Sequence, residues 1–239
     1  MADYNSMASE YAKHRQVHPR VLENLLSVSH LCSSSKVLEV GCGTGNYVIA
    51  LKTAVNCRCW GVDPSEQMLA SVRRRSAEIS FQCGRAEKLS FTSDLFDLVF
   101  SVDVIHHVGG REEYLREAYR VLRKGGRICT VTDSEDMIRG RRPLASYFPE
   151  TIDVDLRRYP RICELKELMG QAGFGGIAEA TVEFPYTLTN IQAYRDRAFS
   201  SLHLTSESAF ERGIAQMERD LATGAIPCLS RYLLLWGTK

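Results

Sequence analysis

Three glycines at alternate positions follow a short apolar run, and they form the segment of this chain best suited to binding a ligand. Residues 37–46 read VLEVGCGTGN and place Gly41, Gly43 and Gly45 between a strand-like and a helix-like segment. Glycine is needed where the backbone turns sharply or where a ligand approaches it closely. A glycine turn between a strand and a helix N-terminus binds nucleotide-like molecules in α/β sheets. The pattern therefore predicts a nucleotide-like cofactor.

The spacing of these glycines separates the known kinds of nucleotide site. A dinucleotide fingerprint has the pattern G-x-G-x-x-G. Here its last position holds Asn46, and the third glycine comes one residue early, at Gly45. No Gly-Lys-Ser/Thr sequence follows, which excludes a P-loop. An NAD-dependent oxidoreductase on a related fold remains an alternative that the spacing disfavours.

An acidic residue stands where the next strand is expected to end. Asp63 follows the apolar run 57–62 and precedes Pro64. A carboxylate in this position accepts hydrogen bonds from ribose hydroxyls. Asp63 also suits the N-cap of the following helix, with Pro64 at the first helical position. Because Asp63 comes after the glycine loop, we favour ribose binding.

His106 and His107 are the candidates for proton transfer. They follow the near-continuous apolar run 96–102, which is typical of a strand buried on both faces. Histidine titrates near neutral pH and serves as a general base. Either histidine could take a proton from a reacting group, and His106 is the preferred candidate. The alternative is that one histidine packs against a neighbouring segment and the other caps the turn.

Strand-like and helix-like segments alternate around these residues, which predicts a parallel, doubly wound α/β sheet. The expected strands are 36–41, 57–62, 79–83, 96–102, 127–132, 177–184 and 229–236. The expected helices are 6–31, 46–53, 65–75, 111–123, 161–172, 189–200 and 206–221. Residues 134–160 show no clear periodicity and are expected to be irregular.

The length of 239 residues, 44% of them hydrophobic, suits a single α/β domain over residues 1–239. We expect a helical cap at 1–31 and a cofactor-binding core at 36–133. Residues 134–160 and 185–226 are extra to that core. Long insertions in compact domains are often functional, so these two are expected to be lid and substrate segments.

The composition narrows the class of partner. The net charge of +1 gives no global field that favours nucleic acid or an anionic membrane. The basic runs 73–75 and 139–142 are expected to be solvated faces. No apolar run approaches the length of a membrane span, and the charged N-terminal residues do not resemble a signal peptide. The oligomeric state stays open.

The eight cysteines are scattered, without a C-x-x-C pair or a Cys/His spacing that suits zinc. We therefore expect no metal and a reduced, cytoplasmic protein.

The pattern E-x-G-x-G-x-G that begins at Glu39 resembles the first motif of class I S-adenosylmethionine-dependent methyltransferases. The resemblance continues through Asp63, the turn at 83–89, the run 96–108 and the Gly-Gly turn at 125–126. It covers residues 36–133 closely and the whole chain loosely. The chain is most similar to the ubiquinone/menaquinone-biosynthesis-like group, whose members methylate small molecules.

This resemblance implies a Rossmann-like methyltransferase fold with seven strands in the order 3-2-1-4-5-7-6, the last of them antiparallel. It implies S-adenosyl-L-methionine as the cofactor. The reaction would be in-line transfer of its methyl group to an O, N, C or S atom of a small-molecule acceptor.

The resemblance also assigns residues to the cofactor. The acidic residue before the loop helps to hold the amino-acid end, the loop passes beside the methionine part, and the turn after the third strand contacts adenine. An N-terminal helix with a Tyr and an Arg closes over the cofactor. The cofactor-binding candidates are Tyr11, Arg15, Glu39, Gly41, Cys42, Gly43, Gly45, Asp63, Pro64, Met68, Arg85, Ala86, Glu87, Ser101 and Val102.

The acceptor is less defined than the cofactor. Enzymes that methylate nucleic-acid bases carry Asn/Asp-Pro-Pro-aromatic where this chain has residues 101–104, SVDV. An RNA or protein methyltransferase and a cofactor-binding protein without activity remain alternatives. The residues His203, Tyr147, Phe148, Tyr159 and Tyr194 lie in the extra segments, where they would form an aromatic lid over an acceptor or simply pack in a core.

Overall fold

The computed structural model describes residue 14 and residues 16–239, and a seven-stranded sheet forms its centre. The strand order is β3-β2-β1-β4-β5-β7-β6, so the expected fold class and strand order are confirmed. The strands are β1 (Lys36–Val40), β2 (Arg58–Asp63), β3 (Ser80–Cys83), β4 (Phe96–Val102), β5 (Leu122–Thr132), β6 (Gly175–Leu188) and β7 (Ile226–Thr238). β1 to β5 pair in parallel, whereas β7 runs antiparallel to β5 and β6.

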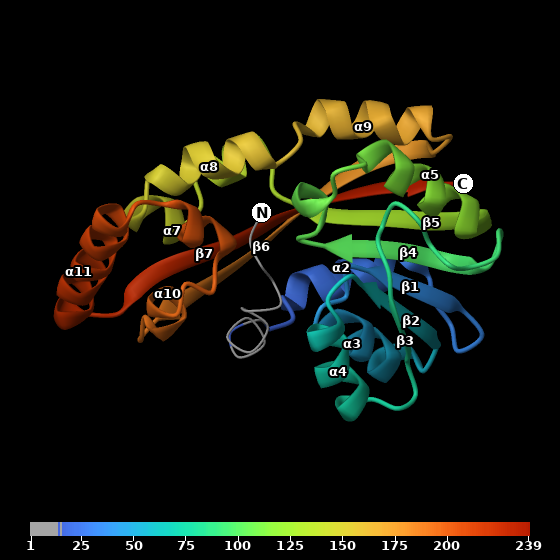
Figure 1. Ribbon diagram of the computed structural model, residues 1–239, viewed down its shortest axis with the longest axis horizontal. Coiled ribbons are helices and arrows are strands. Elements are labelled where there is room, and N and C mark those ends of the chain that lie inside the picture. The colour runs from blue at the N-terminus through green and yellow to red at the C-terminus, as the bar shows by residue number, and fades with distance from the viewer. Residues whose placement is uncertain (1–13, 15) are drawn as a thin grey trace.

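Helices cover both faces of this sheet (Figure 1). Those packed on it are α2 (Pro19–Ser29), α3 (Asn46–Val55), α4 (Glu66–Arg75), α5 (Arg111–Val121) and α9 (Ile162–Gln171). One hydrophobic cluster joins α2, α3 and α4 to one face, and another joins α5 and α9 to the other. Successive residues of β1 serve both clusters: Val37 belongs to the first and Leu38 to the second. A strand buried on both faces needs the apolar run that β1 and β4 contain.

A second group of elements lies beyond the sheet, where β6 and β7 continue as a long antiparallel pair (Figure 1, left). It contains α6 (Glu135–Arg139), α7 (Leu144–Tyr147), α8 (Glu150–Arg158), α10 (Gln192–Arg195) and α11 (Glu207–Thr223). A third hydrophobic cluster holds part of this group together and includes Leu144, Phe148, Tyr194 and Met217. We call this group, residues 134–160 and 185–228, the lid elements.

The expectation that residues 134–160 are irregular is wrong. They form α6, α7 and α8, which are only 5, 4 and 9 residues long. Helices this short do not repeat an apolar position often enough to produce a periodic pattern. The prediction of one helix over 189–200 is also wrong. That range contains α10, which has only four residues, and a 3₁₀ turn follows at Ser200–Leu204.

Boundaries of other elements also differ from expectation, and β5 begins at Leu122 rather than 127. Helix α5 ends at Val121 rather than 123, because Leu122 already pairs with Phe96 in the sheet. β6 and β7 are longer than expected, since they also carry the lid elements. Of the helix expected at 6–31, the structure gives α2, which begins at Pro19. Most of the residues before Pro19 lie outside the described part of the chain.

In the part of the chain that the structure describes, no helix is both long and apolar enough to cross a membrane. All eight cysteines fall in that part, and none is in a disulfide.

Candidate active site

The glycine loop joins β1 to α3 in a conformation that glycine adopts readily. φ is +70° at Gly41, +50° at Gly43 and +72° at Gly45, which is the left-handed region. The N–H groups of Gly41 and Cys42 donate to the carbonyl oxygen of Val62 at 2.7 and 3.0 Å, so β2 anchors the loop. A Cβ placed on Gly43 would meet no described atom within 4 Å. The backbone at Gly43 therefore borders open space that a ligand can enter.

Asp63, the last residue of β2, is hydrogen-bonded to this loop. Its Oδ2 accepts the N–H of Gly43 and its Oδ1 accepts the N–H of Ser65, both at 2.8 Å. Burial raises the pKa of Asp63, while these two N–H groups act to lower it. The N-cap of α4 is Ser65, whose Oγ accepts the N–H of Met68, so the alternative of Asp63 as N-cap is wrong. Each Asp63 oxygen keeps a second lone pair for a hydroxyl.

Glu39 is buried at the end of β1, behind the loop. Its Oε2 accepts the N–H of Val48 at 2.9 Å, and Val48 lies in the first turn of α3. Burial raises the pKa of Glu39 well above its ordinary value, and the Val48 N–H opposes that rise. Glu39 thus satisfies a helix N-terminus from a neighbouring strand. It also forms part of the wall of the cavity beside the loop.

Two cavities meet at Gly41. The glycine-loop cavity is lined by residues that include Glu39, Gly41, Cys42, Gly43, Tyr47 and Val102. The β3-turn cavity lies on the other side of Gly41 and is lined by residues that include Pro64, Arg85, Ala86, Glu87, Val104 and Val108. Most of the site residues expected from the sequence line one of these cavities.

The β3-turn cavity has largely apolar walls with one ion pair at its edge. Arg85 Nη2 lies 3.2 Å from Glu87 Oε1, and the same oxygen accepts the N–H of Gly110 at 3.5 Å. Burial acts to raise the pKa of Glu87. Hydrogen bonds from the backbone N–H of Glu87 itself, from Arg85 and from the N–H of Gly110 outweigh burial and lower that pKa. Apolar walls with one acceptor at the edge suit a flat heterocycle that carries an amino group.

A third cavity, which we call the lid cavity, separates the ends of β4 and β5 from the lid elements. Asp103 and Tyr232 line both the lid cavity and the glycine-loop cavity. The Tyr232 hydroxyl donates to Asp103 Oδ2 at 3.1 Å. Asp103 has a φ of +56°, a strained conformation for a non-glycine residue and one that is found at functional sites. This pair therefore forms the wall that the two cavities share.

A chain of charged side chains surrounds the lid cavity. Arg141 donates from Nη2 to Asp133 and from Nη1 to Asp155 Oδ2, the latter at 2.9 Å. Arg158 donates to Asp155 Oδ1 at 3.1 Å and to Ser200 Oγ at 3.1 Å. Burial, together with the nearby Asp103, raises the pKa of Asp133 to about 6 in spite of Arg141. The expectation that Arg141 belongs to a solvated basic run is wrong, because its guanidinium joins β5 to α8.

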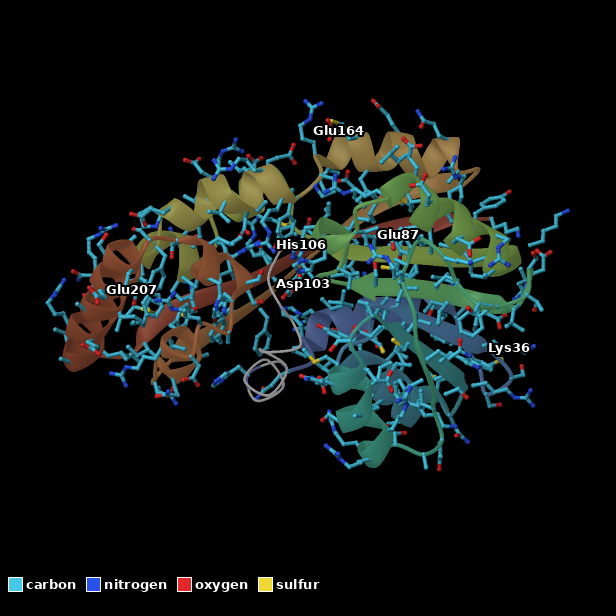
Figure 2. The ribbon with its side chains drawn as sticks, viewed as in Figure 1. Lys36, Glu87, Asp103, His106, Glu164 and Glu207 are labelled. Atoms are coloured by element: carbon cyan, nitrogen blue, oxygen red, sulfur yellow. The ribbon has the colours of Figure 1, made fainter. Side chains whose placement is uncertain are left out.

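The two histidines occupy a 3₁₀ turn, Ile105–His107, directly after β4. His106 lines the lid cavity, whereas His107 lines both that cavity and the β3-turn cavity. Figure 2 shows Asp103 and His106 between the sheet and the lid elements, while Lys36, at the start of β1, lies at the opposite end of the sheet. The histidines therefore stand at the carboxyl ends of the strands, where ligands bind in this kind of sheet.

Some expected cofactor residues are not brought to a cavity wall. Gly45 is the N-cap of α3, and a Cβ there would lie 2.4 Å from the Val72 side chain. Asp63, Met68 and Ser101 are 8%, 3% and 0% exposed, and none of them is among the residues that line the three cavities described above. Tyr11 and Arg15 lie outside the described residues.

Other residues of the site were not expected from the sequence. Asp103, Tyr232, Asp133 and Arg141 come from four separate segments, and their side chains meet only in the folded chain. Among the aromatic residues of the extra segments, Tyr159 and Tyr194 line the lid cavity. Phe148 and Tyr147 pack in the third hydrophobic cluster, and His203 is exposed. The one available signal was that Asp103 and Asp133 each directly follow an apolar strand.

No group of three or more potential metal ligands occurs among the described residues.

Comparison with known proteins agrees with this geometry. A family model described as a methyltransferase domain matches residues 38–130. A demethylmenaquinone methyltransferase of Symbiobacterium thermophilum is 32% identical over 177 residues, which cover 61% of this chain and 70% of that protein. A 27-O-demethylrifamycin SV methyltransferase of Amycolatopsis mediterranei is 30% identical over 126 residues, which cover 50% of this chain and 46% of the relative. The chain thus matches about half the length of this second relative.

A solved structure assigned as a methyltransferase from an antibiotic biosynthesis pathway of Anabaena variabilis has the same fold. Its TM-score is 0.71 at 22% identity, with 94% of this chain and 99% of that chain covered.

The fold is a Rossmann-like α/β sheet with a glycine loop after β1 and a cavity beside that loop. The chain belongs to the class I S-adenosylmethionine-dependent methyltransferases. This assignment decides against the NAD-dependent oxidoreductase.

Proposed function

We propose that this protein transfers a methyl group from S-adenosylmethionine to a nucleophilic atom of a small organic acceptor bound in the lid cavity. The observation that carries the proposal is the shared wall of Asp103 and Tyr232. It joins the cavity beside the glycine loop to a second cavity, which is lined in part by residues of the lid elements. Two cavities separated by one pair of side chains suit a donor and an acceptor that exchange a group.

The residues beside the loop fit this cofactor. The open space at Gly43 admits the methionine part, and the buried Asp63 carboxylate keeps lone pairs for ribose hydroxyls. The apolar walls of the β3-turn cavity, with Glu87 at their edge, suit adenine. Glu39 is close enough to the loop to hold the amino-acid end, in addition to capping α3.

The protein's own contribution is orientation, exclusion of water and proton handling. S-adenosylmethionine supplies an electrophilic methyl group on a sulfonium, so that the acceptor–carbon bond forms as the sulfur–carbon bond breaks. Holding the acceptor nucleophile in line with the methyl–sulfur bond, beside Asp103 and Tyr232, supplies much of the rate. The lid elements cover the cavity and exclude water. His106, on the lid-cavity side, takes the proton of an acidic acceptor O–H or N–H group.

The relatives support a small acceptor rather than a macromolecule. The two relatives described above are named for methylation of menaquinone and rifamycin precursors. The net charge of +1 provides no field that would concentrate RNA. We further propose that the chain forms a single methyltransferase domain and that the lid elements decide which acceptor is bound.

Calorimetry and product detection test the proposal together. S-adenosylmethionine and S-adenosylhomocysteine are expected to bind, and NAD is not. A panel of phenols, amines, thiols and carboxylic acids is then screened for release of S-adenosylhomocysteine. Cofactor binding without turnover of any acceptor would favour a binding protein. Failure of both sulfur ligands to bind would overturn the proposal.

A further inference from the structure

The imidazole of His106 lies against an aromatic ring that comes from a lid segment. The rings of His106 and Tyr159 are stacked, with centroids 4.0 Å apart and an angle of 13° between their planes. Tyr159 follows α8 and His106 follows β4, so the contact joins the lid elements to the sheet. A stacked ring restricts rotation of the imidazole about its side-chain bonds, because tilting it would collide with the neighbouring ring.

Tyr159 is itself held in place by a cation. The guanidinium carbon of Arg141 lies 5.7 Å from the centre of the Tyr159 ring, within the range of a cation–π contact. Arg141 cannot move freely, because Asp133 and Asp155 hold two of its nitrogens. Asp133 directly follows β5, so this route runs from the sheet through Arg141 and Tyr159 to His106.

A second route fixes the backbone around the same histidine. Arg111 donates from Nε to the carbonyl oxygen of Ile105, the residue before His106, at 3.3 Å. Its Nη2 donates to the carbonyl oxygen of Arg158, the residue before Tyr159, at 2.8 Å. One guanidinium thus ties the backbone beside each of the two stacked rings.

We infer that Tyr159 and Arg141 are positioning residues that hold the His106 imidazole in the orientation needed to take the acceptor's proton. The role of His106 in proton transfer rests on the proposed function. The orientation of its imidazole rests only on the contacts described above. It follows that the lid segment 134–160 acts on the proton-transfer group as well as covering the acceptor. A lid that moves away from the sheet would release His106.

Nuclear magnetic resonance tests the positioning without any substrate. The imidazole Cε1–H signal of His106, assigned by its loss in His106→Gln, is compared in the wild type, Tyr159→Phe and Tyr159→Leu. A stacked ring moves this signal upfield, so the wild type and Tyr159→Phe should share a position that Tyr159→Leu abandons. Tyr186→Leu, the same change at another tyrosine of the lid cavity, should leave the signal in place. An unchanged signal in Tyr159→Leu would overturn the inference.

Kinetics test the consequence for the reaction. With an acceptor from the panel, Tyr159→Leu is expected to lower kcat by roughly 10- to 100-fold, with an unchanged KM for S-adenosylmethionine. Tyr159→Phe should restore most of kcat, because it keeps the ring. Arg141→Lys should lie between them, because lysine keeps the charge but not the two-sided contact. A Tyr159→Leu enzyme with wild-type kcat would refute the positioning role. A wild type inactive on every acceptor would refute the proposed function, while the spectra would still decide the orientation.

Discussion

The carboxylate of Asp63 accepts the backbone N–H of Gly43, with 2.8 Å between Oδ2 and N. The contact joins the end of β2 to the turn that follows β1, two neighbouring strands of the sheet. Gly43 lies in the turn beyond the last residue of β1, where the strand ladder no longer supplies an acceptor, and its N–H takes one from the side chain of Asp63. One carboxylate can therefore both shape the glycine loop and accept a ribose hydroxyl.

Replacing Asp63 with alanine should reduce cofactor affinity by about 10-fold or more, since a hydrogen bond to a charged group contributes about 1.5–3 kcal/mol. The loss has two causes, which are the missing ribose acceptor and the unpaired N–H of Gly43. Calorimetric titration with S-adenosylmethionine and S-adenosylhomocysteine measures it.

Asp97→Ala is the matched control. Asp97 Oδ2 also accepts a backbone N–H, that of Lys36 at 2.7 Å, but at the opposite end of the sheet. The Asp97→Ala variant should therefore bind the cofactor with unchanged affinity. If Asp63→Ala binds the cofactor as tightly as Asp97→Ala does, the ribose assignment is wrong.

Glu39 predicts an unusual dependence of stability on pH. Because burial raises its pKa well above the ordinary 4.5, the folded chain keeps a proton that the unfolded chain has released. The stabilising contribution is complete below the unfolded pKa and is lost as the pH rises through the folded pKa. Glu39→Gln is uncharged throughout and keeps an oxygen for the Val48 N–H. Without cofactor, the wild type should therefore lose stability relative to Glu39→Gln as the pH rises from the ordinary pKa of 4.5 toward the raised pKa of the folded chain.

Urea unfolding of both proteins across that range measures the difference. If the wild type instead becomes more stable relative to Glu39→Gln as the pH rises, the Val48 N–H outweighs burial and the Glu39 carboxylate is charged in the folded chain.

The sheet and the long helix α11 were predictable from the sequence, and the short lid helices were not, for a physical reason. A strand buried on both faces, such as β4, needs a continuous apolar run, and α5 shows a regular apolar face. The other lid helices have only 4 to 9 residues, too few to repeat an apolar face, so α7 leaves no periodic trace. Its place depends on Phe148, its C-cap residue, which packs in the same hydrophobic cluster as Met217 of α11.

The same distinction applies to the site. Gly41, Gly43 and Asp63 could be placed because the turn that they build is local or joins adjacent strands. The pairs Asp103–Tyr232 and Asp133–Arg141 could not, because a charged residue in a sequence does not reveal its partner. Arg141 resembles the exposed Arg139 in sequence, and only the fold separates the two.

That contrast yields a prediction about stability. Arg141→Met leaves Asp133 and Asp155 without their shared partner in a buried setting, which should destabilise the fold by about 3–5 kcal/mol. Arg139→Met, two positions away, loses only an exposed contact of 3.9 Å with Asp136 and should stay within about 0.5 kcal/mol of the wild type. Urea unfolding at neutral pH compares them. Equal stability of the two variants would show that the lid-cavity carboxylates need no cation.

Two helical glycines predict how firmly the lid elements are packed. A Cβ on Gly213 of α11 would lie 2.2 Å from Phe148 Cε1 and 2.7 Å from the backbone oxygen of Tyr147, so Gly213→Ala should destabilise by about 1–3 kcal/mol. A Cβ on Gly170 of α9 meets no described atom within 4 Å, so Gly170→Ala should stabilise by about 0.5–1 kcal/mol. Amide hydrogen exchange then locates the effect of Gly213→Ala. Faster exchange confined to α7 and α11 means that the lid opens while the sheet stays folded, as an acceptor entering the lid cavity requires. Faster exchange that extends equally into β1 and β4 would contradict an independently opening lid.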